Sequence, residues 1–81
     1  GSVAFHPLRD DMFVSAGDDG TIRLWQQAGG EWKSFAVDRG NAPRAPVEQA
    51  IFTPADKDGN VEILAVADST IFECSIDGKQ P

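Results

Sequence analysis

Cysteine is nearly absent from this chain of 81 residues, and the scarcity limits how the fold can be held together. The single cysteine, Cys74, has no partner for a disulfide within the chain. Small secreted domains commonly depend on several such bonds, so that class of protein is disfavoured. We therefore expect a protein of a reducing compartment, intracellular and either cytoplasmic or nuclear.

Long apolar runs are missing as well. No stretch approaches the roughly 20 residues that a membrane-spanning helix needs, and the N-terminus lacks the basic start and apolar stretch of a secretory signal. We expect a soluble chain, and any targeting signal would then lie elsewhere in a longer protein.

Basic residues are few. The chain has 7 Lys and Arg against 13 Asp and Glu, and residues 47–81 alone hold two basic and seven acidic side chains. Proteins that bind nucleic acid need Lys and Arg to neutralise phosphates. Nucleic acids and anionic membranes are therefore not expected as partners.

The residues that could carry chemistry do not form a catalytic or metal-binding pattern. His6 is the only histidine, and its place in "FHP" at a strand end favours a surface loop residue over the base of a triad. Cys74 lacks the companions that zinc requires. Residues 56–67 begin like a calcium loop but lack its glycine at position 6 and its glutamate at position 12, so an acidic turn is expected. We expect no enzymatic activity, no metal and no cofactor.

A repeat of short strands is the main positive feature of the sequence. "SVAFHP" at residues 2–7 matches "QAIFTP" at 49–54, and "FVSAGDDGTI" at 13–22 matches "EILAVADSTI" at 62–71. Apolar and β-branched residues come in runs of about five to eight, bounded by Pro, Gly and Asp. The pattern predicts an all-β chain whose strands lie at residues 2–5, 12–17, 21–26, 31–37, 47–52, 61–67 and 70–76.

This repeat of four antiparallel strands separated by Pro, Gly and Asp turns resembles a blade of the WD-repeat β-propeller family. The first unit matches closely over residues 2–26, and the second is degenerate. The resemblance implies that Ser15, Asp19 and Trp25 form a structural hydrogen-bond network. An indole N–H that is buried needs an acceptor, and a turn aspartate can accept from backbone N–H groups. The histidine of the family's network is missing, and Gln26 stands where the family's Asp follows Trp.

The second unit departs from the family pattern at three aligned positions. A charge on a strand that is normally covered on both faces is costly unless it is paired. The glutamate of the second unit, Glu73, therefore implies either that this face of the strand is uncovered or that a basic residue faces it. The three replacements are Cys74 for Trp25, Leu64 for Ser15 and Glu73 for Leu24.

The fold implied by the resemblance is all-β, with two four-stranded antiparallel blades of a WD-repeat propeller. The first blade is expected at residues 1–37, an interblade loop at 38–46, and a degenerate second blade with an incomplete fourth strand at 47–81. Two blades do not close a ring, so we expect either a fragment of a larger ring or a self-assembling unit.

The implied function is a non-catalytic scaffold for protein–protein interaction, part of a propeller in a larger assembly. Its partners would be other proteins or the remaining blades. The alternative is a homo-oligomeric two-blade repeat that closes a propeller with interblade ligand pockets. Trp32 is expected in the core, with a partly exposed position as the alternative. The candidate partner contacts are charged residues expected on one face of the propeller: Arg39, Arg44, Asp18 and Asp68.

Overall fold

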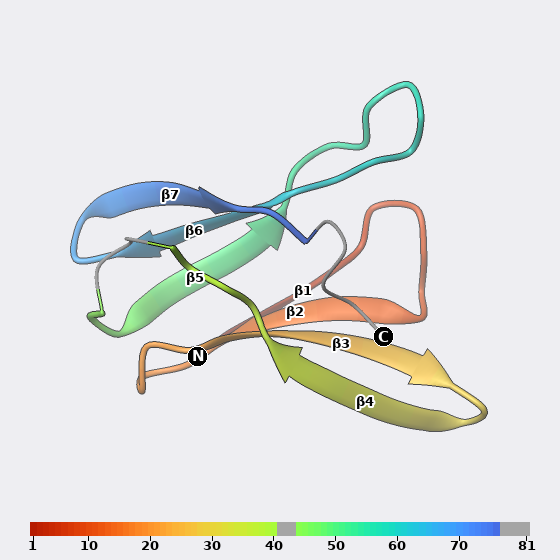
Figure 1. Cartoon of the computed structure of the whole chain (residues 1–81), viewed down its shortest axis with the longest axis horizontal. Helices are drawn as coiled ribbons and strands as arrows, with labels where there is room; N and C mark the ends of the chain where they lie inside the picture. Colours follow the sequence, from red (N-terminus) through yellow and green to blue (C-terminus); the bar gives the residue numbers. More distant parts are fainter. Residues whose placement is uncertain (41–43, 77–81) are drawn as a thin grey trace.

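The computed structural model describes residues 1–40 and 44–76, and this part of the chain forms two antiparallel β-sheets (Figure 1). Both sheets are meanders in which each strand pairs with the next along the chain. Sheet 1 consists of β1 (Ser2–Phe5), β2 (Met12–Ala16), β3 (Ile22–Ala28) and β4 (Glu31–Ala36). Sheet 2 consists of β5 (Val47–Phe52), β6 (Ile63–Ala67) and β7 (Thr70–Cys74).

The all-β prediction is confirmed, and all seven strands lie where the sequence pattern predicts them. The largest boundary differences are two residues: β6 begins at Ile63 and not at Val61, β3 ends at Ala28 and not at Gln26, and β7 ends at Cys74 and not at Ile76. Sheet 2 has three strands instead of the four of a complete blade. The residues expected to begin a fourth strand, 77–81, lie outside the described part of the chain, as do residues 41–43 of the interblade loop.

The two hairpins that follow β2 and β6 use different turns. In the first, the N–H of Gly17 donates to the carbonyl of Thr21 at 3.0 Å, and Gly20 adopts a φ of 84°. In the second, Asp68 and Ser69 both have positive φ, at 52° and 61°. Two consecutive residues with positive φ match the twist of antiparallel strands, so β6 and β7 are joined by a tight two-residue connection.

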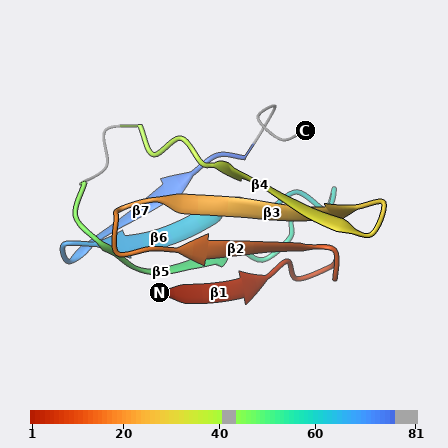
Figure 2. The same cartoon turned by 90° about the horizontal axis from the view of Figure 1, so that it is seen from below.

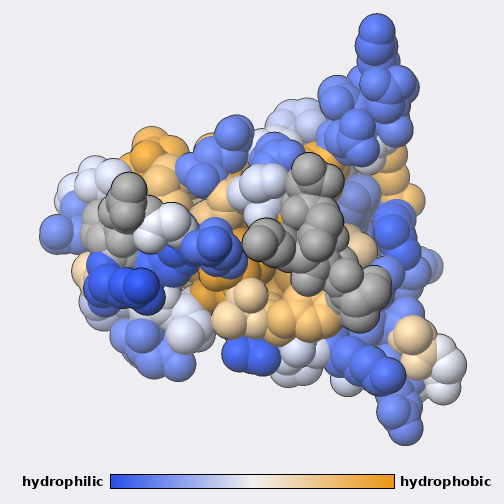
Figure 3. Space-filling view, in the orientation of Figure 1, coloured by the Kyte–Doolittle hydropathy of each residue, from blue (hydrophilic) through white to orange (hydrophobic). Residues whose placement is uncertain are grey.

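Alternating burial along β2 and β6 shows which side of each sheet faces the core. In β2 the buried residues are Met12, Val14 and Ala16, and in β6 they are Ile63, Ala65 and Ala67. These side chains belong to a single hydrophobic cluster between the sheets. Figure 3 shows apolar side chains gathered between the two sheets, with polar and charged side chains on the projecting turns.

The two sheets meet mainly where β5 lies against β1 and β2 (Figures 1 and 2). Two hydrogen bonds cross this seam. The N–H of Ala50 donates to Ser2 Oγ at 3.2 Å, and the N–H of Val47 donates to the carbonyl of Gly17 at 3.1 Å. Sheet 2 is thus fixed to sheet 1 through its first strand.

In residues 1–40 and 44–76 we find no helix with the length and apolar character needed to cross a membrane.

Candidate functional site

The strand registers define equivalent rows of side chains in the two sheets. A row consists of residues paired across neighbouring strands, so its side chains lie on one face of the sheet. The sequence repeat equates Phe5 with Phe52 and Trp25 with Cys74, which begin and end the corresponding rows. These rows are Phe5, Phe13 and Trp25 in sheet 1, and Phe52, Ile63 and Cys74 in sheet 2.

Equivalent rows face opposite sides of the seam. Phe5 points away from sheet 2 and is 57% exposed, whereas Phe52, Ile63 and Cys74 are buried against sheet 1. The neighbouring rows show the reverse arrangement. Leu24 is buried at the seam, and its equivalent Glu73 is exposed. The seam therefore joins one face of the first repeat to the opposite face of the second.

This head-to-tail packing leaves one face of each sheet without a covering sheet in the described structure. We call these the outer faces. The outer face of sheet 1 carries Val3, Phe5, Phe13, Ser15, Arg23, Trp25 and Trp32. The outer face of sheet 2 carries Ile51, Leu64, Val66, Ile71 and Glu73.

Aromatic rings dominate the outer face of sheet 1. Phe13 lies at the centre, with its ring centroid 5.5 Å from that of Trp25 in a nearly parallel stack. Phe5 and Trp32 approach Phe13 in tilted arrangements, with centroids at 5.3 and 5.0 Å. Trp32 is 39% exposed, so the expectation that it lies in the core is wrong. It lies on β4, at the periphery of an aromatic cluster on the uncovered face.

The structure brings together two of the three residues assigned to the network. Trp25 Nε1 donates to Ser15 Oγ at 3.0 Å across the β2–β3 pair. Asp19 lies in the exposed turn, and its carboxylate accepts instead from the backbone N–H and the hydroxyl of Thr21, at 3.0 and 2.7 Å. Its short side chain reaches a neighbour two residues along the chain, so it closes the turn locally.

Removing the indole donor or its acceptor tests this contact. We expect Trp25→Phe and Ser15→Ala each to lower the free energy of unfolding, with a coupling between them of about 0.5–1.5 kcal/mol, the net value of one hydrogen bond. Denaturant unfolding followed by circular dichroism measures both single variants and the double variant. Strictly additive effects would show that the bond contributes nothing to stability.

Acidification should weaken the β2–β3 turn. The hydroxyl and the backbone N–H of Thr21 donate to Asp19 and hold its pKa below the ordinary value of 3.8. Because the folded-state pKa is depressed, this stabilisation is present above about pH 3.8 and is lost as the pH falls through the lower folded-state value. We expect Asp19→Asn to flatten the acid loss of stability in denaturant unfolding measured over this range. Asp18→Asn removes the same charge from the same turn, and an equal effect there would exclude the bonds to Thr21 as the cause.

The strand registers show that one of the three replacements inferred from the sequence alignment was assigned to the wrong position. Glu73 and Cys74 do occupy the places of Leu24 and Trp25. Leu64, however, pairs with Ile51 and Glu73 and so takes the place of Val14, while Ala65 takes the place of Ser15. The direct alignment fails here because the second hairpin turn is one residue shorter. Of the two explanations offered for Glu73, the uncovered face is the one that the described residues support.

The β2–β3 and β6–β7 turns, which carry Asp18 and Asp68, lie at one end of the molecule (Figures 1 and 2). Arg39 and Arg44 lie beside Gly20 of the first of these turns. Asp18, Asp68 and Arg44 are exposed there. Arg39 is half-buried: its Nη1 donates to the carbonyl of Gly20, and its guanidinium lies 5.4 Å from the ring centroid of Phe72. Arg39 therefore bridges the first hairpin turn and sheet 2.

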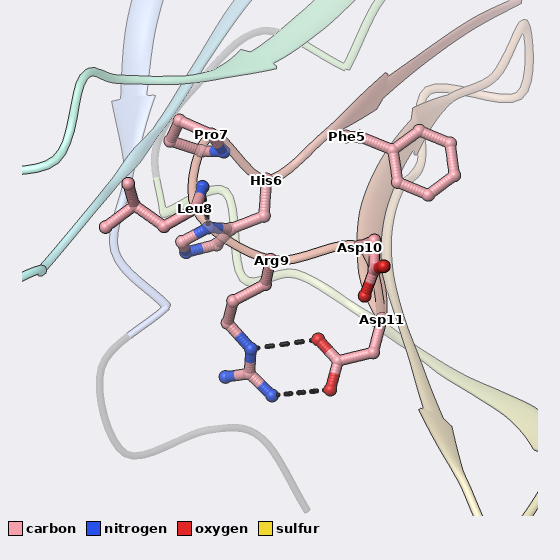
Figure 4. A pocket seen from close by; sticks show the side chains of 7 residues that line it. All are labelled: Phe5, His6, Pro7, Leu8, Arg9, Asp10 and Asp11. Carbon is pink, nitrogen blue, oxygen red and sulfur yellow. Dashed lines mark hydrogen bonds and ion pairs between the residues drawn. The ribbon is translucent and has the colours of Figure 1, made fainter.

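The surface hollow beside His6 is formed by the β1–β2 loop, residues 5–11 (Figure 4). His6 Nδ1 accepts from the N–H of Leu8 at 3.0 Å, and burial together with the charge of Arg9 lowers the pKa of the imidazole. The carboxylate of Asp11 is held by Arg9 through two bonds of 2.9 Å. Because Asp11 faces the guanidinium, the loop forms a local ion pair and not a carboxylate–histidine pair.

The stretch that begins like a calcium loop forms a hydrogen-bonded turn. One carboxylate oxygen of Asp56 accepts from the N–H groups of Asp58 and Asn60, at 2.8 and 2.9 Å. These bonds, that of Asn60 foremost, lower the pKa of Asp56. Within the described ranges no three His, Cys, Asp or Glu side chains are grouped so that they could hold a metal ion. Burial raises the pKa of the Cys74 thiol.

The two outer faces are thus the candidate functional surface of the described residues. No family model, curated protein or solved structure matches the chain. Sequence reasoning identified Trp25, Ser15 and Asp19 but missed the outer aromatic cluster as a surface. The alternation of apolar residues on both sides of β1–β3 was the signal that could have indicated it.

Proposed function

We propose that this chain contributes two WD-repeat-like blades to a β-propeller and acts as a non-catalytic scaffold for protein–protein interaction. The observation that supports this proposal is the head-to-tail seam, in which equivalent rows of the two repeats face opposite ways. An interface of this kind can be repeated, because each added sheet offers the same free face as the one before it. Repetition closes a ring when the rotation between neighbours permits.

The shape of the seam adds support. The sheets are in contact chiefly through β1, β2 and β5, the early strands of each repeat. In a propeller the first strand of each blade lies nearest the central axis, so contacts concentrated there are those expected of neighbouring blades. The later strands, β4 and β7, would then lie toward the circumference.

Apolar side chains on the outer faces also favour a role in assembly. Phe5, Val3 and Ile71 are all more than half exposed. The residue equivalent to each of them in the other repeat is buried at the seam. Exposed apolar side chains that gather on one face of a sheet can mark interaction surfaces. The charged turns at one end, which carry Asp18 and Asp68, would remain accessible to protein partners after stacking.

Tandem fusions of one, two and three copies through a flexible linker test the stacking directly. If outer faces pack on one another, each new seam stabilises its neighbours, and the denaturation midpoint should rise with copy number. As a matched control, Ile71→Lys in every copy should abolish the rise while changing the stability of a single copy by about 0.5 kcal/mol or less. A midpoint that stays at the single-copy value would contradict the proposed function.

A further inference from the structure

We propose that a second copy of this chain docks head-to-tail, with the outer face of sheet 1 of one copy on the outer face of sheet 2 of the other, and that Arg23 and Glu73 pair across this interface. The inference rests on the proposed function, because it requires that the outer faces stack. It adds the partner and the contact that aligns it.

The two outer faces differ in chemistry in a way that suits each to the other. The face of sheet 1 is aromatic, with Phe13 stacked on Trp25, and its cation is Arg23. The face of sheet 2 is aliphatic, with Ile51 and Ile71 exposed, and its anion is Glu73. Apolar contact would supply the affinity, and the opposite charges would favour this pairing of faces.

The repeat itself predicts where the two charges would meet. Arg23 occupies the row position of Phe72, and Glu73 occupies that of Leu24. Leu24 and Phe72 belong to the same hydrophobic cluster at the seam inside the chain. If the seam between copies repeats the seam within the chain, Glu73 and Arg23 take the places that Leu24 and Phe72 hold in that apolar cluster.

Arg23 is positioned to accept such a partner. Its Nε donates to Ser34 Oγ at 3.1 Å, and its Nη2 donates to the Ser34 carbonyl at 3.5 Å, so the guanidinium lies along β4. A guanidinium carries five N–H donors, and these two bonds leave further donors for a carboxylate. Glu73 is exposed on β7 and needs no rearrangement of the sheet to reach a partner.

Docking of like faces is disfavoured by the same residues. Two sheet 2 faces would bring Glu73 near its own copy, and two sheet 1 faces would do the same for Arg23. Like charges opposed across an interface cost free energy, so the head-to-tail arrangement is selected over a symmetric one.

Light scattering after size exclusion tests the inference on the 81-residue chain. The wild type should be larger than the 8.7 kDa monomer, and E73R and R23E should each weaken association at least about tenfold, equivalent to about 1.4 kcal/mol. The double variant R23E/E73R should recover it. An equimolar mixture of the two single variants should also assemble, because each then offers the complement of the other. Asp58→Arg makes the same charge change in the β5–β6 turn and should have no effect.

Circular dichroism of each variant verifies that the sheets are retained. A monomeric wild type, single variants that associate as the wild type does, or a double variant that fails to recover association would each overturn the inference. The tandem fusions separate its failure from that of the proposed function. If the denaturation midpoint rises with copy number but the charge variants have no effect on association, the stacking of outer faces is supported and the Arg23–Glu73 pair is rejected.

Discussion

Truncation of Ile63 to alanine should lower the free energy of unfolding by about 2–5 kcal/mol, because the lost methyl groups leave a cavity at the seam. Ile63 is fully buried at the start of β6, where it pairs with Phe52 on one side and Cys74 on the other. A domain of 81 residues is stabilised by about 4–12 kcal/mol in total. The variant should therefore lose a large part of its stability.

Ile71 provides a matched control on the neighbouring strand. It is the same residue type in the same sheet, but it points to the outer face and is 72% exposed. Ile71→Ala should change stability by about 0.5 kcal/mol or less in the monomer. Urea unfolding at low protein concentration, followed by tryptophan fluorescence, compares the two. Equal losses would show that the seam is not where sheet 2 derives its stability.

Replacement of Gly20 by alanine should cost about 2–5 kcal/mol, the second largest effect that we expect. Its φ of 84° is a conformation that costs an L-residue about 1–2 kcal/mol. An added Cβ would lie 3.1 Å from Arg39 Nη1 and 3.1 Å from the carbonyl oxygen of Arg44. Crowding of this kind typically adds about 1–3 kcal/mol. The β2–β3 turn and the β4–β5 loop would have to separate.

Gly59 separates the cost of the backbone conformation from the cost of crowding by the added Cβ. Its φ is 83°, almost the same as that of Gly20, but a Cβ there would meet nothing within 4 Å. Gly59→Ala should therefore cost only about 1–2 kcal/mol for the backbone conformation. The effect of alanine on the unfolded chain is similar at both sites, so it cancels in the comparison. If thermal or denaturant unfolding gives the same loss of stability for both variants, the β4–β5 loop does not pack on Gly20.

Much of the fold could be predicted because the sequence signals of β-strands are local. Alternation in "MFVSA" and "ILAVA" and the Gly, Asp and Pro residues between runs placed all seven strands. Positions near the turns were less predictable. The second hairpin is one residue shorter than the first, and this difference shifted Leu64 from the place assigned to it by alignment to that of Val14.

The candidate site was predicted only in its local parts. Trp25 and Ser15 are diagonal neighbours on adjacent strands and form a hydrogen bond. Asp19 was assigned to the same network, but a turn aspartate finds donors two residues away before it can reach across a sheet. Arg39 was expected to face a partner, and contacts with Gly20 and Phe72 draw it toward the interior. These contacts join residues far apart in the sequence, so no local pattern encodes them.

The strand positions, the meander order within each repeat and the kind of residue on each face of each sheet follow from the amino-acid sequence alone. The sequence did not determine which face is buried, because β1–β3 and β5–β7 carry apolar residues on both sides. Ile22 and Ile71 are equivalent in the repeat, yet the first is fully buried and the second lies in the open. The packing of the sheets selects between them, because residues 1–40 and 44–76 form two sheets that meet at one seam, and a seam can cover one face of each.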